Sequence, residues 1–187
     1  MVRDDLGIWQ MVREEVPWAR AAPDLTYPVH AVRDGITAAV AARGLAHDPS
    51  RTERFQAAWH LAQEHANTAR ALDLHLLRRW QQVVLGHADV PFRTGPAFAK
   101  RGQERYGLSD RTEADFAECI AQATATGTGI PLPARAARAY LDVCFFHPFS
   151  DGNGRSALLA LGFVLAREHV FLDEARPLQV RRFPHDA

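Results

Sequence analysis

The sequence has little of the residue types that build covalent or metal cross-links. Only two of its 187 residues are cysteines, Cys119 and Cys144, and each lies in an apolar segment with helical spacing. We therefore expect buried, reduced thiols. No spacing of cysteine and histidine suggests zinc, so a disulfide scaffold and a zinc finger are both excluded. Lysine occurs only at Lys100, and arginine carries the rest of the positive charge.

Long hydrophobic runs and an excess of one charge sign are also missing. The longest apolar run, residues 157–166, is about half of the ~20 residues that a membrane helix needs. The amino terminus lacks the layout of a signal peptide. The formal net charge is +0, which gives no indication of nucleic acid or an acidic membrane surface as a partner. We predict a cytoplasmic protein that binds neither membranes nor nucleic acids.

The periodicity of the apolar residues is mostly helical, which predicts an all-α fold. A chain of 187 residues with 47% hydrophobic residues suits one domain over residues 1–187. Its core is expected at about 50–170, after a helical N-terminal extension at 1–50. Helices are expected over residues 30–42, 50–71, 72–86, 110–123, 134–146 and 156–165.

Local signals mark several boundaries of these elements. Ser50–Glu53 and Asp110–Glu113 have the layout of capping boxes and indicate helix starts. Gly86 indicates a helix end. Residues 90–106 differ from their surroundings, because glycine and proline interrupt them. A turn near 100–102 predicts a short β-hairpin there, with a surface loop as the alternative.

The most informative stretch is residues 147–155, His-Pro-Phe-Ser-Asp-Gly-Asn-Gly-Arg, directly before an apolar helical run. Gly152 and Gly154 permit a tight, left-handed turn that aims backbone N–H groups at one point. The helix that follows adds its unpaired N–H groups and the positive end of its dipole. Such a turn predicts a pocket for phosphate. The alternative is an exposed loop built from ordinary turn residues.

Three side chains around this turn add the other components of phosphate chemistry. Arg155 offers a planar fork of donors that suits phosphate oxygens. Asp151 is an oxygen ligand that suits Mg²⁺ on the same phosphate. His147 titrates near neutrality and can take a proton from an attacking hydroxyl. Together they predict phosphoryl or nucleotidyl transfer.

This stretch resembles the signature of Fic-domain proteins, His-x-Phe-x-(Asp/Glu)-Gly-Asn-Gly-Arg-x-x-Arg. The matching residues are His147, Phe149, Asp151, Gly152, Asn153, Gly154 and Arg155. The resemblance covers about residues 70–170 and implies a Fic-like helical bundle with a β-hairpin flap before the signature helix pair. In the family the flap aligns the target by strand addition. This assigns Arg93, Thr94 and Gly95 to the flap and the target.

The resemblance also implies a reaction and a role for each residue. His147 deprotonates a Ser, Thr or Tyr hydroxyl of a target, which attacks the α-phosphate of a nucleotide, usually ATP, and receives AMP. Asp151 holds Mg²⁺ on the phosphates, and Arg155 neutralises the leaving phosphates. Phe149 anchors the loop in the core. The residues expected at the bound nucleotide are Gly152, Asn153, Gly154, Arg155, Ser156 and Phe149.

The last arginine of the signature is replaced here by Leu158. In the family this arginine contacts the terminal phosphate and, in self-inhibited members, a regulatory glutamate in a (Ser/Thr)-x-x-x-Glu-(Gly/Asn) motif that this sequence lacks. Either the enzyme is unregulated in cis, where a separate antitoxin can control it, or its donor is not a nucleoside triphosphate, since relatives transfer UMP, phosphocholine or phosphate. Gly154 argues against the kinase variant, which has lysine at that position.

Three functions stay open at this point. The first is an adenylyltransferase that modifies a protein hydroxyl. The second is an enzyme that moves another phosphate-containing group from a different phosphate ester to a small-molecule acceptor. The third is a non-catalytic binding module with the same fold, which the intact set of His147, Asp151 and Arg155 argues against. A homodimer is a further expected assembly.

Overall fold

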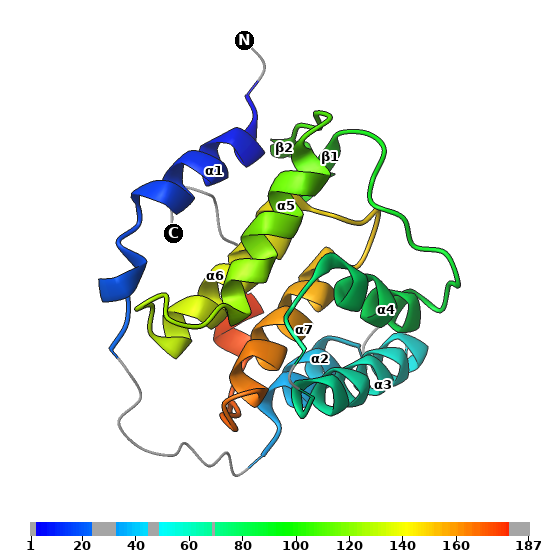
Figure 1. The fold of residues 1–187 in the computed structure, drawn as a ribbon. Coiled ribbons are helices and arrows are strands. Elements are labelled where there is room, and N and C mark those ends of the chain that lie inside the picture. Colours follow the sequence, from blue (N-terminus) through cyan, green and yellow to red (C-terminus); the bar gives the residue numbers. More distant parts are fainter. Residues whose placement is uncertain (1–2, 24–32, 45–48, 69, 180–187) are drawn as a thin grey trace.

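The computed structural model describes residues 3–23, 33–44, 49–68 and 70–179. Within these ranges it contains seven α-helices and one two-stranded antiparallel sheet (Figure 1). The helices are α1 (Asp5–Glu15), α2 (Gly35–Gly44), α3 (Pro49–Ala66), α4 (Leu74–Leu85), α5 (Thr112–Ala121), α6 (Leu132–Phe146) and α7 (Asn153–Ala166). The strands are β1 (Ala97–Ala99) and β2 (Glu104–Tyr106). The predicted helical fold with one β-hairpin is confirmed.

Helix α7 lies at the centre of the molecule and packs against α6, α3 and α4 (Figure 1). Its residues from Ser156 to Ala166 are all buried, as expected of a helix that is hydrophobic on every side. Gly162 allows α7 to approach its neighbours closely, because a Cβ there would lie 2.6 Å from the side chains of Ile36 and Trp59. The core therefore fixes the position of α7, and the signature loop leads directly into its N-terminal end.

Helix α1 is anchored on α6 by a buried ion pair. Arg13 Nε lies 2.7 Å from Asp142 Oδ1, and Trp9 Nε1 donates to the same oxygen at 3.1 Å. All three side chains are buried. Within the expected N-terminal extension, α1 packs on the helix that ends at the signature loop.

Two helices begin at residues other than those that the capping boxes indicated. Helix α3 begins at Pro49, so Ser50 lies inside its first turn and not before it. Proline suits this position because its φ is already helical and its missing N–H is not needed there. Helix α5 begins at Thr112, whose hydroxyl accepts a hydrogen bond from the N–H of Ser109 at 2.8 Å.

The remaining boundaries agree more closely with the sequence. Helix α4 ends at Gly86, which adopts the left-handed conformation with φ 70°. Helix α3 ends at Ala66, before the predicted end near residue 71. Helix α2 begins at Gly35. Residues 30–32 of the helix predicted there lie outside the described residues.

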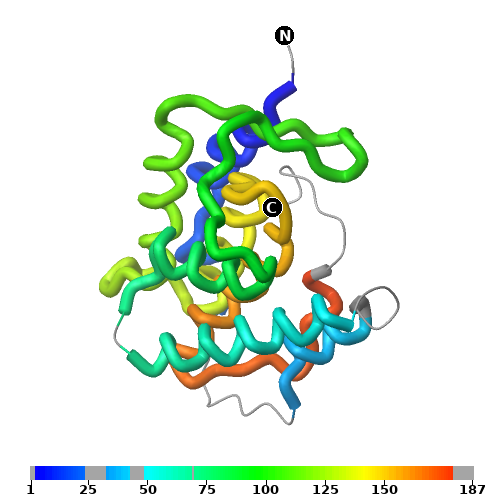
Figure 2. The backbone as a smooth tube through the Cα atoms, turned by 90° about the vertical axis from the view of Figure 1, so that its right-hand side faces the viewer, coloured from blue at the N-terminus to red at the C-terminus, as the bar shows by residue number. Residues whose placement is uncertain are grey.

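Strands β1 and β2 form the predicted hairpin, and its turn lies at Lys100–Gly102. Figure 2 shows the hairpin at the opposite end of the molecule from α2 and α3. The paired residues are Ala97 with Tyr106, Phe98 with Arg105, and Ala99 with Glu104. Residues 91–96, which the sequence also placed in the flap, lie before the paired strands.

The beginning of α1 covers the outer edge of β2. The Asp5 carboxylate accepts a hydrogen bond from the N–H of Arg105 at 3.0 Å, and Asp4 accepts one from the N–H of Gly107 at 2.8 Å. Since Arg105 directs its N–H away from β1, it forms a non-hydrogen-bonded pair with Phe98. The backbone N–H and C=O of Phe98 therefore point to the outer edge of β1. Within the described part of the chain, this edge has no partner strand.

The two cysteines are half-buried and form no disulfide. Burial raises the pKa of the Cys119 thiol to about 12, so this residue carries no reactive thiolate near neutral pH. This agrees with the predicted reduced state.

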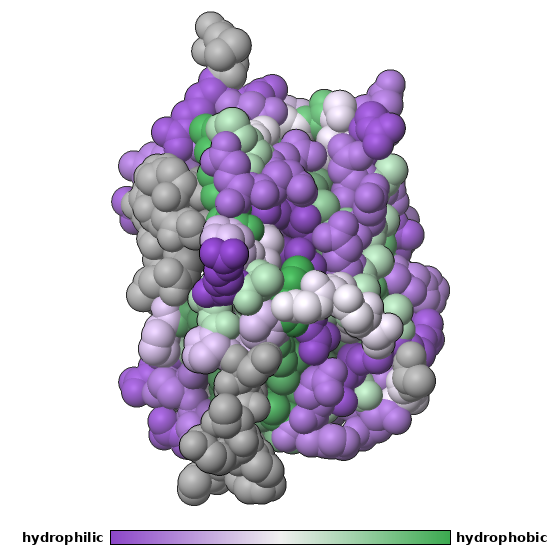
Figure 3. Space-filling model, turned by 60° about the vertical axis from the view of Figure 1, so that its left-hand side comes forward, coloured by the Kyte–Doolittle hydropathy of each residue, from purple (hydrophilic) through white to green (hydrophobic). Residues whose placement is uncertain are grey.

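The face of the molecule seen in Figure 3 is mostly hydrophilic, and its hydrophobic areas are small and separated. Among the described helices, none has the length and apolar character needed to cross a membrane. The cytoplasmic location stays a prediction.

Candidate active site

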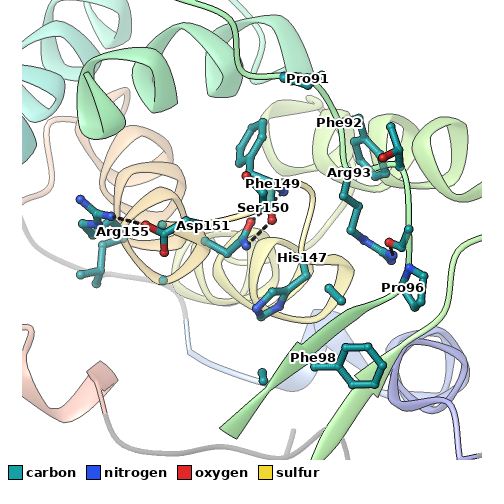
Figure 4. Close-up of a pocket in the computed structure, with 18 of the residues that line it drawn as sticks. Pro91, Phe92, Arg93, Pro96, Phe98, His147, Phe149, Ser150, Asp151 and Arg155 are labelled. Atoms are coloured by element: carbon teal, nitrogen blue, oxygen red, sulfur yellow. Dashed lines mark hydrogen bonds and ion pairs between the residues drawn. The ribbon is translucent and has the colours of Figure 1, made fainter. Parts of the chain in front are cut away.

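The signature loop lines a cavity of about 980 Å³ (Figure 4). The other walls come from residues 91–99, from two residues of α3, and from one residue each of α2, α6 and the later part of α7. The predicted site residues that line it are Arg93, Thr94, Gly95, His147, Phe149, Asp151, Gly152, Asn153, Gly154 and Arg155. Ser156 is the one predicted residue that does not. The fold therefore brings the signature loop and the start of the flap to one cavity.

His147 lies at the end of α6, between the Asp151–Arg155 pair and the hairpin (Figure 4). It adopts a left-handed backbone with φ 49°. Its Nδ1 lies 2.6 Å from the carbonyl oxygen of Cys144. Because a carbonyl only accepts, Nδ1 carries the proton and Nε2 keeps a free lone pair. Burial lowers the pKa of His147, so the imidazole is neutral at physiological pH. Position and protonation state both suit a general base.

The hairpin holds the His147 ring through a short chain of contacts. Tyr106 stacks on the imidazole with a centroid distance of 4.6 Å and an interplanar angle of 14°. The Tyr106 hydroxyl donates to Glu104, whose other oxygen lies 2.6 Å from Lys100 Nζ. Burial and the bond to Glu104 both raise the pKa of Tyr106. Lys100, the single lysine of the chain, thus stabilises the buried carboxylate of Glu104, which in turn holds Tyr106 against His147. In the sequence, the only signal for this role was the i, i+4 spacing of Lys100 and Glu104.

The glycine-rich turn has the conformation that the sequence predicts. Gly152 caps α7 with φ 76°, in the left-handed region. Among the described residues, the N–H groups of Asn153 and Gly154 have no hydrogen-bond partner. A Cβ at Gly154 would meet no atom within 4 Å, so there is open space beside these donors. The backbone N–H of Arg155 differs from these two donors, because it already donates to the carbonyl of Gly152 at 2.9 Å.

Two side chains expected to contact the nucleotide instead hold the loop together. The Asn153 side chain donates to the Phe149 carbonyl at 2.7 Å and accepts from the Phe149 N–H at 3.0 Å. The Phe149 ring is fully buried. Its predicted role as an anchor agrees with this burial, and its contact with the nucleotide stays a prediction, since Phe149 also lines the cavity. Asn153 offers its backbone N–H to a ligand, while its side-chain amide is engaged by the backbone of Phe149.

Ser156 was also predicted to bind the nucleotide, but it does not line the cavity. Its buried hydroxyl donates to Gln81 Oε1 at 2.5 Å, and its N–H donates to the Gly152 carbonyl at 3.0 Å. Gln81 of α4 is fully buried, and its Nε2 donates to the backbone carbonyl of Asp151 at 2.5 Å. This glutamine joins α4 to both ends of the turn. The sequence reasoning missed Gln81, although its helical spacing from Leu77 and Val84 places it on the buried face of α4.

Replacing Gly152 by alanine should lower the free energy of unfolding by about 1–3 kcal/mol, the range for a strained backbone position. The new Cβ would lie 2.5 Å from Gln81 Nε2, and alanine disfavours a φ of 76°. Urea unfolding followed by circular dichroism measures the change. Gly154→Ala is the matched control, because its Cβ meets open space in a helix, where alanine is favoured by ~1 kcal/mol. Equal destabilisation by both substitutions would contradict this account of the turn.

Asp151 lies at the exposed side of the cavity, with 63% of its side chain accessible. Its Oδ2 lies 3.3 Å from Arg51 Nη2 and 3.4 Å from Arg155 Nη2. Arg155 also donates to the carbonyl of Val84 at 3.2 Å. In the described part of the chain, no three His, Cys, Asp or Glu side chains lie close enough together to hold a metal ion by themselves. A single carboxylate fits Mg²⁺, which commonly binds through one protein carboxylate, substrate phosphates and water.

Position 158 faces the cavity, as the signature implies, but its side chain is apolar. Leu158 is buried and lines the wall together with Val40 of α2 and Tyr140 of α6. Tyr140 donates its hydroxyl to the carbonyl of Leu178 at 2.6 Å. At position 158, α7 therefore presents no positive charge to the cavity.

Arg93 was predicted to contact the target, and its side chain instead braces the flap. It is buried, and its guanidinium donates to the carbonyls of Phe146, Gly95 and Gly107. Its N–H donates to the Pro148 carbonyl at 2.9 Å. These bonds tie both ends of the hairpin to the signature loop. Thr94 and Gly95 line the cavity, and their contact with a target stays a prediction.

A helical bundle, a β-hairpin and this loop at the start of a central helix define a Fic domain. The model of the Fic/DOC family matches residues 71–165, just over half of the chain. The chain belongs to the Fic/DOC family. No match was found among curated proteins.

Several solved structures share the fold at low sequence identity. IbpAFic2 covalently tethered to Cdc42 has a TM-score of 0.59 and 17% identity, and the match covers 87% of this chain and 55% of that one. Fic-1 from C. elegans has a TM-score of 0.51 and 18% identity over 88% of this chain and 58% of that one. A Fic-domain signaling protein from Bacteroides thetaiotaomicron has a TM-score of 0.51 and 20% identity over 64% and 48%. The chain thus spans about half of these proteins.

IbpAFic2 was also solved in complex with adenylylated Cdc42. That structure has a TM-score of 0.55 to this chain, with 17% identity over 87% of this chain and 54% of that one. At this identity the likeness shows a common fold.

Proposed function

We propose that the protein transfers AMP from a nucleoside triphosphate to a hydroxyl group of a target. The observation that carries this proposal is the position of a neutral, oriented imidazole beside unpaired backbone N–H groups in one cavity. A base alone occurs in many kinds of site, and so does a phosphate-binding turn. Their combination fits an attack on phosphorus by a hydroxyl.

In the proposed reaction, His147 Nε2 takes the proton as the target oxygen bonds to the α-phosphorus. The bond to the β-phosphate breaks, and pyrophosphate leaves with its electron pair. The N–H groups of Asn153 and Gly154 stabilise the charge on the α-phosphate oxygens. Arg155 donates to the phosphates that leave. Asp151 would hold Mg²⁺, which neutralises phosphate charge when it is bound.

The hairpin supports a protein as the target. Phe98 directs its backbone N–H and C=O to the open edge of β1, and 61% of the residue is exposed. An extended segment that added to this edge would gain main-chain hydrogen bonds and a contact with the phenyl ring. Tyr106, which pairs within the same hairpin, touches the base. A segment on this edge would thus be held beside His147, as suits a fold shared with a protein bound to Cdc42.

A second candidate follows from Leu158. A cavity wall without the arginine of the signature also suits a donor other than a nucleoside triphosphate, with a small-molecule acceptor. A separate antitoxin and a homodimer stay predictions. The third reading, a module without catalysis, gives no reason for the bond from Nδ1 to Cys144 that frees Nε2.

The test is label transfer from α-³²P-labelled ATP, CTP, GTP and UTP to the protein itself and to proteins of a cell lysate. It is run with and without Mg²⁺, beside a His147→Ala control. Transfer that needs Mg²⁺ and is lost in the control supports the proposal and identifies the donor. Absence of transfer from all four nucleotides, together with tight binding of another phosphate ester, would favour the second candidate.

A further inference from the structure

The cavity lacks a cation where the family signature places one. Leu158 is buried there, beside Val40 and Tyr140. A nucleoside triphosphate brings several negative charges into a partly enclosed space, and charge that is neither paired nor hydrated is costly to bury. If the donor carries phosphates beyond the α position, another residue must supply a donor group to them.

Three guanidinium groups line the cavity, and they differ in how far the protein occupies them. Arg93 is buried and uses its donors on three backbone carbonyls. Arg155 bonds to the carbonyl of Val84 as well as to Asp151. Arg51 has Asp151 as its one partner among the described residues, and half of its side chain is exposed. Arg51 is therefore the guanidinium that can bind a ligand with the smallest loss of hydrogen bonds to the protein.

A second side chain of the same helical turn also points to a ligand. Thr52 lines the cavity and is buried, and its Oγ1 has no hydrogen-bond partner in the described part of the chain. A buried hydroxyl is normally paired, and a hydroxyl can rotate to donate to an acceptor. The first turn of α3 thus brings a half-exposed guanidinium and an unpaired hydroxyl to the cavity. Both are donors, as phosphate oxygens require.

We propose that Arg51 binds the phosphates of the donor beyond the α position, in place of the cation absent at Leu158. The assignment rests on the proposed nucleotidyl transfer. Arg51 comes from a helix 100 residues away from Asp151 in the sequence, so the signature alone does not include it. In the protein without ligand, Arg51 and Arg155 share one oxygen of Asp151. Binding of the donor would exchange this exposed ion pair, which is worth little, for a charge-assisted bond to phosphate.

Calorimetric titration with α,β-methylene-ATP and with AMP, both with Mg²⁺, tests this assignment. The methylene bridge prevents transfer, and AMP has only the α-phosphate. Arg51→Gln should weaken binding of the analogue about 10- to 100-fold, the range for loss of a hydrogen bond to a charged group. Its affinity for AMP should stay the same. Arg51→Lys should keep part of the preference for the triphosphate, because it retains the charge but not the fork.

Arg111→Gln is the matched control, because Arg111 is an exposed arginine that also pairs with one aspartate, Asp115, and neither residue lines the cavity. It should bind both ligands as the wild type does. Leu158→Arg added to Arg51→Gln should restore the preference for the triphosphate analogue. A folded double variant that binds both ligands alike would overturn the assignment.

The outcomes separate this inference from the proposed function. A wild-type protein that binds the analogue no better than AMP, or an Arg51→Gln variant that loses both ligands equally, overturns the role of Arg51. Nucleotide transfer then still stands. A wild-type protein that binds no nucleotide at all removes the proposed function and the inference with it.

Discussion

Replacing His147 by alanine should reduce the rate of label transfer about 10²- to 10⁴-fold, the contribution of a general base. The imidazole has an unprotonated ring nitrogen, Nε2, and its orientation is fixed by Cys144 on one side and Tyr106 on the other. Alanine removes the base and leaves the N–H groups of the turn in place. Initial rates at saturating nucleotide measure the effect.

The binding of nucleotide should survive this substitution, because the phosphate-binding turn does not depend on the imidazole. His60→Ala is the matched control, since His60 is an exposed histidine of α3 away from the signature loop. It should leave the rate unchanged. A His147→Ala variant that binds nucleotide and transfers label at the wild-type rate would exclude His147 as the base.

The pH dependence gives an independent check on the same residue. Because burial lowers the pKa of His147, the rate should be level near neutrality and fall at acidic pH, below the usual histidine pKa of about 6.5. In that range the unfolded chain binds a proton at this site more readily than the folded protein does. The contribution of His147 to stability is therefore present above about pH 6.5 and is lost as the pH falls below it. His147→Ala should remove this acid-side change in stability.

Much of the site was predictable because its backbone conformation is encoded locally. Glycine at 152 and the apolar run after Ser156 specify a left-handed turn and a helix, and both form. The turn of the hairpin at Lys100–Gly102 was predicted on the same basis. In each case neighbours in the sequence determine the backbone, so one stretch of sequence is sufficient.

The errors concern side chains whose partners lie far away in the sequence. Ser156 has the chemistry of a phosphate ligand, and whether it binds phosphate depends on what packs behind it. Gln81 occupies the hydroxyl of Ser156 from a helix 75 residues earlier. Arg93 was assigned to the flap and the target, and its guanidinium donates to the carbonyls of Phe146, Gly95 and Gly107. Such contacts arise from the packing of α4, the flap and α7, which no local pattern specifies.

The role of the N-terminal residues was open in the sequence and is clear in the fold. Helix α1 holds the hairpin by Asp4 and Asp5, and it is itself held on α6 by Arg13 and Asp142. The flap therefore depends on a helix that lies outside the region matched by the family model.

Replacing Asp142 by alanine should lower the free energy of unfolding by about 3–5 kcal/mol, the cost of breaking a buried ion pair from one side. The substitution leaves the Arg13 guanidinium buried without its carboxylate and removes the acceptor of Trp9 Nε1. Urea unfolding of the variant and the wild type measures the difference. Asp142→Asn should cost less, because an amide oxygen can still accept from Trp9.

Glu14→Ala tests the same arginine from its exposed side. Glu14 pairs with Arg13 at 3.5 Å, but 80% of its side chain is accessible, so its loss should cost about 0–1 kcal/mol. If Asp142→Ala and Glu14→Ala destabilise the protein equally, the buried pair does not anchor α1. If only Asp142→Ala destabilises it, α1 is released from α6 and the brace on β2 is lost with it. Amide hydrogen exchange at Arg105 and Gly107 should then increase, because their N–H groups donate to Asp5 and Asp4 of this helix.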